Sequence, residues 1–163
     1  MQDDFFHAPV MLKEVVEMLL INKKGVYVDA TLGGAGHARA ILENSDCFLV
    51  GIDRDEEALR YAEKNLARFE KRIVLVKANF SDLGRVLEKL DIEKVDGVLF
   101  DFGVSSHQLD TPERGFSFNF EAPLDMRMDG GAKLSAHDIV NGYEQKDLEN
   151  IIRSYGEERM AAR

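Results

Sequence analysis

Short apolar and β-branched runs alternate with segments of helical periodicity along the chain up to Asp101. Four runs have the length and composition of buried strands: Val26–Asp29, Phe48–Asp53, Ile73–Lys77 and Val95–Asp101. Between these runs, apolar residues recur at helical spacing, namely Ala58, Leu59, Ala62, Leu66 and Phe69, and then Leu83, Val86, Leu87 and Leu90. Residues Val10 to Leu20 form one more amphipathic pattern before the first strand. The alternation predicts an α/β fold.

The spacing of the runs predicts how the strands pair. Their starts lie about 22 to 25 residues apart, which leaves room for a crossover helix each time. We therefore expect parallel strands with right-handed connections and helices on both faces of the sheet. Four parallel strands with two open edges form a marginal sheet, so we expect the sheet in this chain to be incomplete.

The pattern changes after Asp101. Residues 103–133 are rich in glycine, proline and charge and contain no strand pattern. Helices are predicted near Ala136–Val140 and over Gln145–Tyr155, and the last residues resemble the start of another helix. We expect one unit over 1–108 and a second over 109–163.

Composition narrows the class of protein. A hydrophobic fraction of 45% with 31% charged residues is typical of a soluble globular chain. No apolar run approaches the roughly 20 residues of a membrane span, the first residues are acidic, and the single Cys47 has no disulfide partner, so we expect a cytoplasmic protein. The net charge of −9 disfavours a freestanding nucleic-acid module but is compatible with an enzyme that has a local basic site.

The segment Asp29–His37 is a glycine loop between the first strand and a helix. Its glycines let a ligand approach the backbone, and Asp53, at the end of the next strand, suits hydrogen bonding to a ribose diol. The dinucleotide fingerprint needs a third glycine, but Arg39 stands at that position. Asp29 repels a pyrophosphate and suits a sulfonium and an amino group, which favours S-adenosylmethionine. A purely structural turn is the alternative.

Two further residues have open interpretations. His37 is a candidate base or metal ligand, but no cluster with metal-ligand spacing supports a metal, and a role in shaping the cofactor loop is favoured. Phe80 follows the third strand, where its ring either stacks on an adenine or packs in the core; the sequence does not separate the two.

Asp101 ends the fourth strand, on the edge where the cofactor is expected. A carboxylate there can accept the proton of an exocyclic amine that attacks a methyl group. A phosphoacceptor or helix N-cap is the alternative, although residues 103–106 do not begin an apolar helical pattern, which disfavours the cap. Gln108 can hydrogen-bond either cofactor or substrate.

Residues 113–129 mix arginines with aromatic side chains. This mixture suits stacking and phosphate contacts in single-stranded RNA. An ordered loop that packs Phe116, Phe118 and Met126 onto the domain explains the same composition.

These motifs together resemble the MraW family of small-subunit ribosomal RNA methyltransferases. The matching blocks are His7–Leu12, Tyr27–Thr31, Gly33–His37, Gly51–Asp55, Asp101–Ser106, Gln108–Asp110, Arg114–Phe118, Pro123–Asp129 and Tyr155–Arg159. The resemblance implies a Rossmann-like class I methyltransferase sheet, here its S-adenosylmethionine-binding N-terminal half over 1–108. Residues 109–163 would then begin an inserted helical domain for substrate recognition.

The resemblance also implies a reaction. It implies methylation of the N4 amine of a cytidine in the 16S rRNA of the small ribosomal subunit, with S-adenosylmethionine as donor. The implied cofactor contacts are Gly34, Ala35, Gly36, His37, Asp53, Phe80, Asp101 and Gln108, and Asp101 is also the implied catalytic residue.

Phe102 stands where the family usually has leucine, and the family is longer than this chain. A truncated remnant that binds the cofactor without turnover is therefore one alternative. A nicotinamide-dependent oxidoreductase is another, disfavoured by the missing third glycine.

Overall fold

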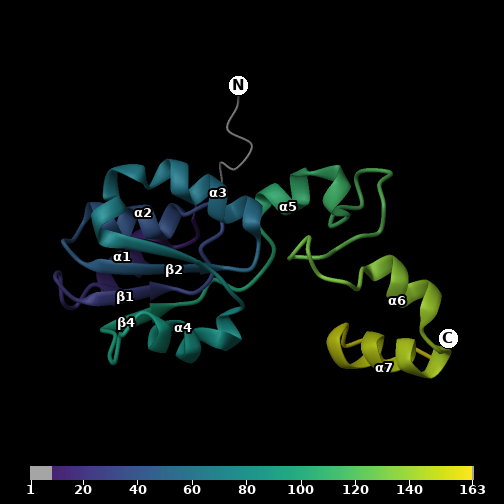
Figure 1. Cartoon of the computed structure of the whole chain (residues 1–163). Coiled ribbons are helices and arrows are strands. Elements are labelled where there is room, and N and C mark those ends of the chain that lie inside the picture. The colour runs from purple at the N-terminus through teal and green to yellow at the C-terminus, as the bar shows by residue number, and fades with distance from the viewer. Residues whose placement is uncertain (1–8, 163) are drawn as a thin grey trace. The chain divides into compact units, whose positions relative to one another are not determined.

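A parallel sheet of four strands organises the first part of the chain. The strands are β1 (Val26–Asp29), β2 (Phe48–Asp53), β3 (Ile73–Lys77) and β4 (Gly97–Leu99), in the spatial order β3-β2-β1-β4 (Figure 1). The computed structural model describes residues 9–162, so the first two residues of the block that begins at His7 lie outside the described part. A first compact unit ends at His107 and a second begins at Gln108.

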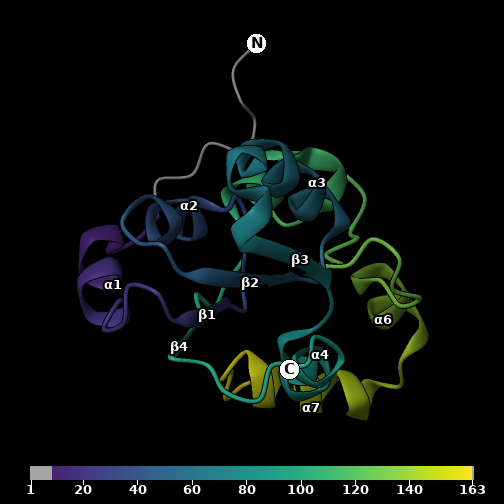
Figure 2. The same ribbon diagram turned by 60° about the vertical axis from the view of Figure 1, so that its left-hand side comes forward.

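Helices cover both faces of the sheet. In the first unit they are α1 (Leu12–Leu19), α2 (Gly36–Glu43), α3 (Glu56–Asn65) and α4 (Leu83–Lys89), with 3₁₀ turns at η1 (Ala67–Arg72) and η2 (Phe80–Asp82). Figures 1 and 2 show α2 and α3 on one face and α4 on the other. The chain moves outward from β1 to β3 and then returns to place β4 on the free side of β1. Because parallel crossovers are right-handed, this reversal puts α4, which connects β3 to β4, on the face opposite α2 and α3.

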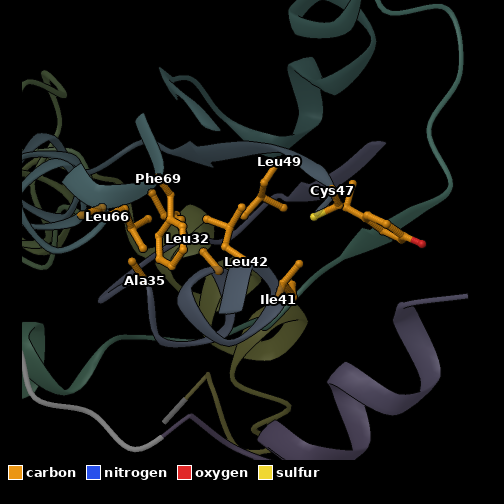
Figure 3. Close-up of a cluster of buried hydrophobic side chains, with 11 residues drawn as sticks. Leu32, Ala35, Ile41, Leu42, Cys47, Leu49, Leu66 and Phe69 are labelled. Carbon is orange, nitrogen blue, oxygen red and sulfur yellow. The ribbon is translucent and has the colours of Figure 1, made fainter. Parts of the chain in front are cut away.

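Alternating side chains of the strands build two apolar layers. Tyr27 and Leu49 point to the face covered by α1, α2 and α3, whereas Val28 and Val50 point to the face covered by α4. Figure 3 shows the first layer, where residues of α2 such as Ile41 and Leu42 pack with Leu49. The central strands are buried on both faces, which explains their nearly continuous apolar sequence.

A hydrogen-bonded clasp closes the amino ends of β1 and β4. The Asp96 carboxylate accepts from the backbone N–H of Val26 at 2.8 Å and from the side-chain amide of Asn22 at 3.1 Å. The hydroxyl of buried Tyr27 donates to the carbonyl of Asn22 at 2.9 Å and accepts from its N–H at 3.0 Å. The clasp, formed by Asn22, Tyr27 and Asp96, joins segments that are about 70 residues apart in sequence and helps to set the pairing of β1 with β4.

The second unit contains helices and loops and no strand in its described residues. Its elements are α5 (Ser106–Asp110, which begins just before it), η3 (Pro112–Arg114), α6 (Ala136–Gly142) and α7 (Gln145–Tyr155). A capping box starts α6: the Ser135 hydroxyl accepts from the N–H of Asp138, whose carboxylate accepts from the N–H of Ser135.

The prediction of a Rossmann-like α/β sheet is confirmed, and the first three strands have the predicted bounds. The fourth is shorter than predicted at both ends, because its pairing with β1 runs only from Gly97 to Leu99. The short helix α5 was not predicted, and the helix expected at the end of the chain is wrong for residues 157–162, which form turns and irregular chain. Among residues 9–162, none of the helices combines the length and apolar character needed to span a bilayer.

Candidate functional site

Three aspartates meet at the carboxyl edge of the sheet. Asp29 and Asp53 are the last residues of β1 and β2, and Asp101 lies two residues beyond β4. Because the strands are parallel, their carboxyl ends share one edge. β1 lies between β2 and β4, so Asp29 takes the middle position, next to Gly51 on one side and Leu99 on the other. We call Asp29, Asp53 and Asp101 the acidic edge.

Asp53 is oriented by two backbone groups. Its Oδ2 accepts from the N–H of Gly33 at 2.8 Å, and its Oδ1 accepts from the N–H of Asp55 at 2.8 Å. Burial raises the pKa of Asp53, and these two hydrogen bonds act in the opposite direction. Each carboxylate oxygen keeps a lone pair for a further donor. The glycine loop and the acid are therefore joined directly.

Asp29 is almost fully enclosed, with 1% of its surface exposed. Its pKa is raised from 3.8 to about 7, chiefly by burial and also by the charges of Asp53 and Asp101, against a hydrogen bond from the N–H of Thr31 that lowers it. The three carboxyl groups are thus close enough to influence one another. A cation bound at the acidic edge would relieve their repulsion.

Asp101 is held from the backbone side by Thr31, whose hydroxyl accepts the Asp101 N–H at 2.6 Å. Its side chain is half-exposed, and its Oδ2 lies 3.8 Å from Nδ1 of His37. His37 itself is buried in the first turn of α2, with Nε2 2.9 Å from the carbonyl of Val10. The roles of Thr31 and Val10 could not be predicted from the sequence, because each residue acts through a single polar atom.

The glycine loop has the backbone geometry expected of a ligand-binding turn. Gly33 has φ +48°, and a Cβ added there would meet only the carbonyl of Thr31 at 3.9 Å. Ala35 has φ 61°, an uncommon conformation for a residue with a side chain. Helix α2 then begins at Gly36, and its N-cap residue, Ala35, makes no side-chain hydrogen bond to the first turn. Strain of this kind is often found at binding sites.

Phe80 lies at the start of η2, just beyond β3, and is 39% exposed. It contacts two other rings edge-on: Phe100 at a centroid distance of 6.0 Å and Phe102 at 5.4 Å. Phe100 and Phe102 are stacked at 5.4 Å. Phe80 is therefore neither an enclosed core residue nor isolated, and it retains free ring surface near the carboxyl edge. Phe100 and Phe102 are two residues apart in the extended segment after β4, so their rings lie on the same side of the chain and can stack.

Gln108 is buried and is the first residue of the second unit. Its predicted contact with the cofactor stays a prediction. Its neighbour His107, in the first unit, places Nε2 3.4 Å from a carboxylate oxygen of Glu57 at the start of α3.

The arginines of the loop after α5 hold that loop together. Arg127 donates to both carboxylate oxygens of Asp125, at 2.8 and 2.6 Å, and to the carbonyl of Ala132 at 2.8 Å. Arg114 donates to the carbonyls of Arg127 and Met128, at 3.0 and 3.2 Å. These hydrogen bonds lie within the loop, which is therefore ordered by its own arginines. Packing is wrong for Phe118, which is fully exposed.

The residues of the acidic edge fit S-adenosylmethionine better than a dinucleotide. Carboxylates at the ends of β1, β2 and β4 suit a sulfonium, an ammonium and a ribose diol, whereas a pyrophosphate would meet like charge. Within residues 9–162, no group of three or more His, Cys, Asp or Glu side chains is arranged to hold a metal ion.

Comparisons with known proteins agree with this chemistry. The family model described as the MraW methylase family matches residues 4–163. A protein named ribosomal RNA small subunit methyltransferase H from Caldicellulosiruptor bescii is 55% identical over 161 residues, which cover 98% of this chain and 52% of that protein. Its namesake from Carboxydothermus hydrogenoformans is 52% identical over 97% of this chain and 51% of its own length.

Among solved structures, a Clostridium thermocellum protein provisionally named an rRNA methylase superposes with a TM-score of 0.48 and 21% identity, over 61% of this chain and 55% of its own. The chain spans about half the length of the curated relatives it matches. The family model covers nearly every residue, including the glycine loop and all three carboxylates of the acidic edge. The chain therefore belongs to the MraW methylase family.

Proposed function

We propose that this chain binds S-adenosylmethionine at the acidic edge, with Asp53 holding the ribose diol and the backbone of Gly34, Ala35, Gly36 and His37 facing the rest of the cofactor. The carrying observation is the acidic edge itself, where Asp53 and Asp101 both act electrostatically on the buried Asp29 beside an open glycine turn. Asp53 has both oxygens oriented by backbone N–H groups and keeps lone pairs for two hydroxyls. The exposed ring surface of Phe80 supports stacking on the adenine.

The reaction we propose is methylation of the N4 amine of a cytidine in 16S rRNA. When bound, S-adenosylmethionine would supply an electrophilic methyl group, with its sulfonium sulfur as the leaving group. The chain must orient the amine and accept its proton, and we assign both roles to Asp101, whose half-exposed carboxylate supports the proposal. The relatives' name, ribosomal RNA small subunit methyltransferase H, supports an rRNA substrate.

We further propose that the second unit contributes to substrate recognition and that Gln108 is a cofactor contact. Its loop presents a fully exposed aromatic ring, Phe118, which suits stacking on an unpaired base. A buried cysteine without a disulfide partner in the described residues, Cys47, fits a role in the reducing cytoplasm, where ribosomal subunits are modified.

Calorimetry with S-adenosylmethionine and with NADH tests the cofactor, and transfer of labelled methyl groups to undermethylated small subunits tests the reaction. We expect the chain to bind S-adenosylmethionine and not NADH, and to transfer the methyl group. Binding without methyl transfer would identify the chain as a non-catalytic remnant of the enzyme, and binding of NADH alone would refute the proposed cofactor.

A further inference from the structure

The buried ring of His37 lies between two hydrogen-bond acceptors. Nε2 is 2.9 Å from the carbonyl oxygen of Val10, and Nδ1 is 3.8 Å from Oδ2 of Asp101. A carbonyl can only accept a hydrogen bond, so Nε2 must carry a proton to bond with it. In the neutral ring, Nδ1 is then bare and faces the carboxylate. The His37 side chain is 9% exposed, so little water can substitute for these neighbours.

The neutral His37 ring has one hydrogen-bond donor too few for its two neighbours. A neutral imidazole has one N–H, and here it faces two acceptors. One more proton, placed between Nδ1 and Oδ2, gives both nitrogens a partner. The present 3.8 Å separation is longer than a hydrogen bond, so the ring and carboxylate must approach by about 1 Å to share it. Such contacts commonly tighten when substrate binds.

The two partners are fixed from opposite sides. Val10 precedes α1, and its carbonyl holds the far side of the ring. The Thr31 hydroxyl accepts the backbone N–H of Asp101 at 2.6 Å and fixes the backbone of that residue. The movement that closes the gap is therefore confined to the half-exposed Asp101 side chain.

We propose that His37 is a positioning residue that shares with Asp101 the proton released when the amine is methylated. This role rests on the proposed function. The amine nitrogen gains a carbon and loses a hydrogen; that proton passes to Oδ2 of Asp101 and is then shared with Nδ1 of His37. The negative carboxylate and neutral ring become a neutral pair with hydrogen bonds complete on both sides. The proton later returns to solvent through exposed Asp101, which restores the pair.

Nitrogen-15 spectra of the histidine rings test the pair in the full chain without any turnover. The His37 signals are assigned by their loss in His37→Gln. We expect Nε2 to be protonated and Nδ1 to be bare in the wild type, and we expect Asp101→Asn, which removes the charge that faces Nδ1, to shift the Nδ1 signal. Glu57→Gln is the matched control, because Glu57 faces His107, and it should move the His107 signals and leave His37 unchanged. An Nδ1 signal that is identical in the wild type and Asp101→Asn overturns the proposal.

Two substitutions separate the proton-sharing role from a purely structural one. The amide of His37→Gln is long enough to donate to the Val10 carbonyl but puts no nitrogen base beside Asp101, whereas the shorter His37→Asn loses the contact with Val10. In His37→Gln we expect unchanged melting temperature and cofactor affinity, with turnover about 10- to 100-fold lower. Unchanged turnover in a preparation that transfers methyl groups would reduce His37 to a structural contact. If the wild-type chain does not bind S-adenosylmethionine, the proposed function is refuted. The nitrogen-15 spectra still show whether His37 and Asp101 interact.

Discussion

Replacing Asp29 with asparagine removes a buried charge and keeps the oxygen that accepts the N–H of Thr31 at 3.2 Å. The side chain is enclosed at the end of β1, and burial is the largest cause of its raised pKa, followed among the raising causes by the charges of Asp53 and Asp101. Asparagine has nearly the same shape and no charge. The substitution therefore isolates the cost of ionising this one group.

The sign and size of the effect follow from the displaced pKa. A carboxyl whose folded-state pKa is raised stabilises the fold fully below its ordinary value of 3.8, and this contribution is lost as pH rises through about 7. The displacement from 3.8 to about 7, at about 1.4 kcal/mol for each tenfold change in proton affinity, sets an upper limit of about 4 kcal/mol. Asp29→Asn should be more stable than the wild type above pH 7 by up to this amount and equal to it near pH 4.

Urea unfolding at about pH 8 and about pH 4, followed by circular dichroism, measures the difference. The exposed Asp46→Asn is a matched control that should leave the pH dependence unchanged. An Asp29→Asn variant with the same advantage at both pH values, or with none under alkaline conditions, would show that Asp29 is not the group responsible.

Ionisation of Asp29 should strengthen ligand binding, although it destabilises the free chain. An ionised Asp29 attracts a cation, so affinity for S-adenosylmethionine should rise as pH increases through about 7, while the stability of the free chain falls. In Asp29→Asn both trends should weaken together. Calorimetry across this range checks it, and a wild-type affinity that is independent of pH would count against ionised Asp29 as a cofactor contact.

Three other substitutions test separate parts of the molecule. Asp53→Ala should weaken cofactor binding by about 1–3 kcal/mol in calorimetry, because the ribose hydroxyls lose a charged acceptor; unchanged affinity would contradict the assignment. Gly115→Ala should destabilise the chain to urea by about 1–3 kcal/mol, since φ there is +70° and the added Cβ would overlap the carbonyl of Pro123; an unchanged midpoint would refute this. Arg127 holds the pKa of Asp125 at about 2, so their contact stabilises the fold above pH 3.8 and is lost as pH falls through about 2. Solvent screening limits the contribution of the Arg127–Asp125 contact to folding stability to about 1 kcal/mol. In Arg127→Ala, carbon NMR of Asp125 should show an ordinary carboxyl titration.

The hydrophobic pattern was sufficient to predict the strands and the longest helix of the second unit. β1, β2, β3 and α7 have the predicted bounds because each is a continuous apolar or strictly periodic run. β4 was overextended for a local reason. The Asp101 N–H bonds to the Thr31 side chain instead of a neighbouring strand, and a sequence pattern does not show this exchange.

The acidic edge could be predicted in part, because the carboxyl ends of parallel strands always share an edge. The partners of His37 could not be predicted. Val10 lies 27 positions before it, and Asp101 comes close only because β4 returns to lie beside β1. Periodicity records which residues are buried, and it carries no information on strand order.

The clasp formed by Asn22, Tyr27 and Asp96 lies at the end of the sheet opposite the acidic edge. Adjacent to it, Lys23 and Lys24 are exposed on the turn that leads into β1. A linker attached at these lysines would sit a strand's length from the carboxylates. Immobilisation on a sensor surface through this turn is therefore a practical way to measure ligand binding with the binding end directed away from the support.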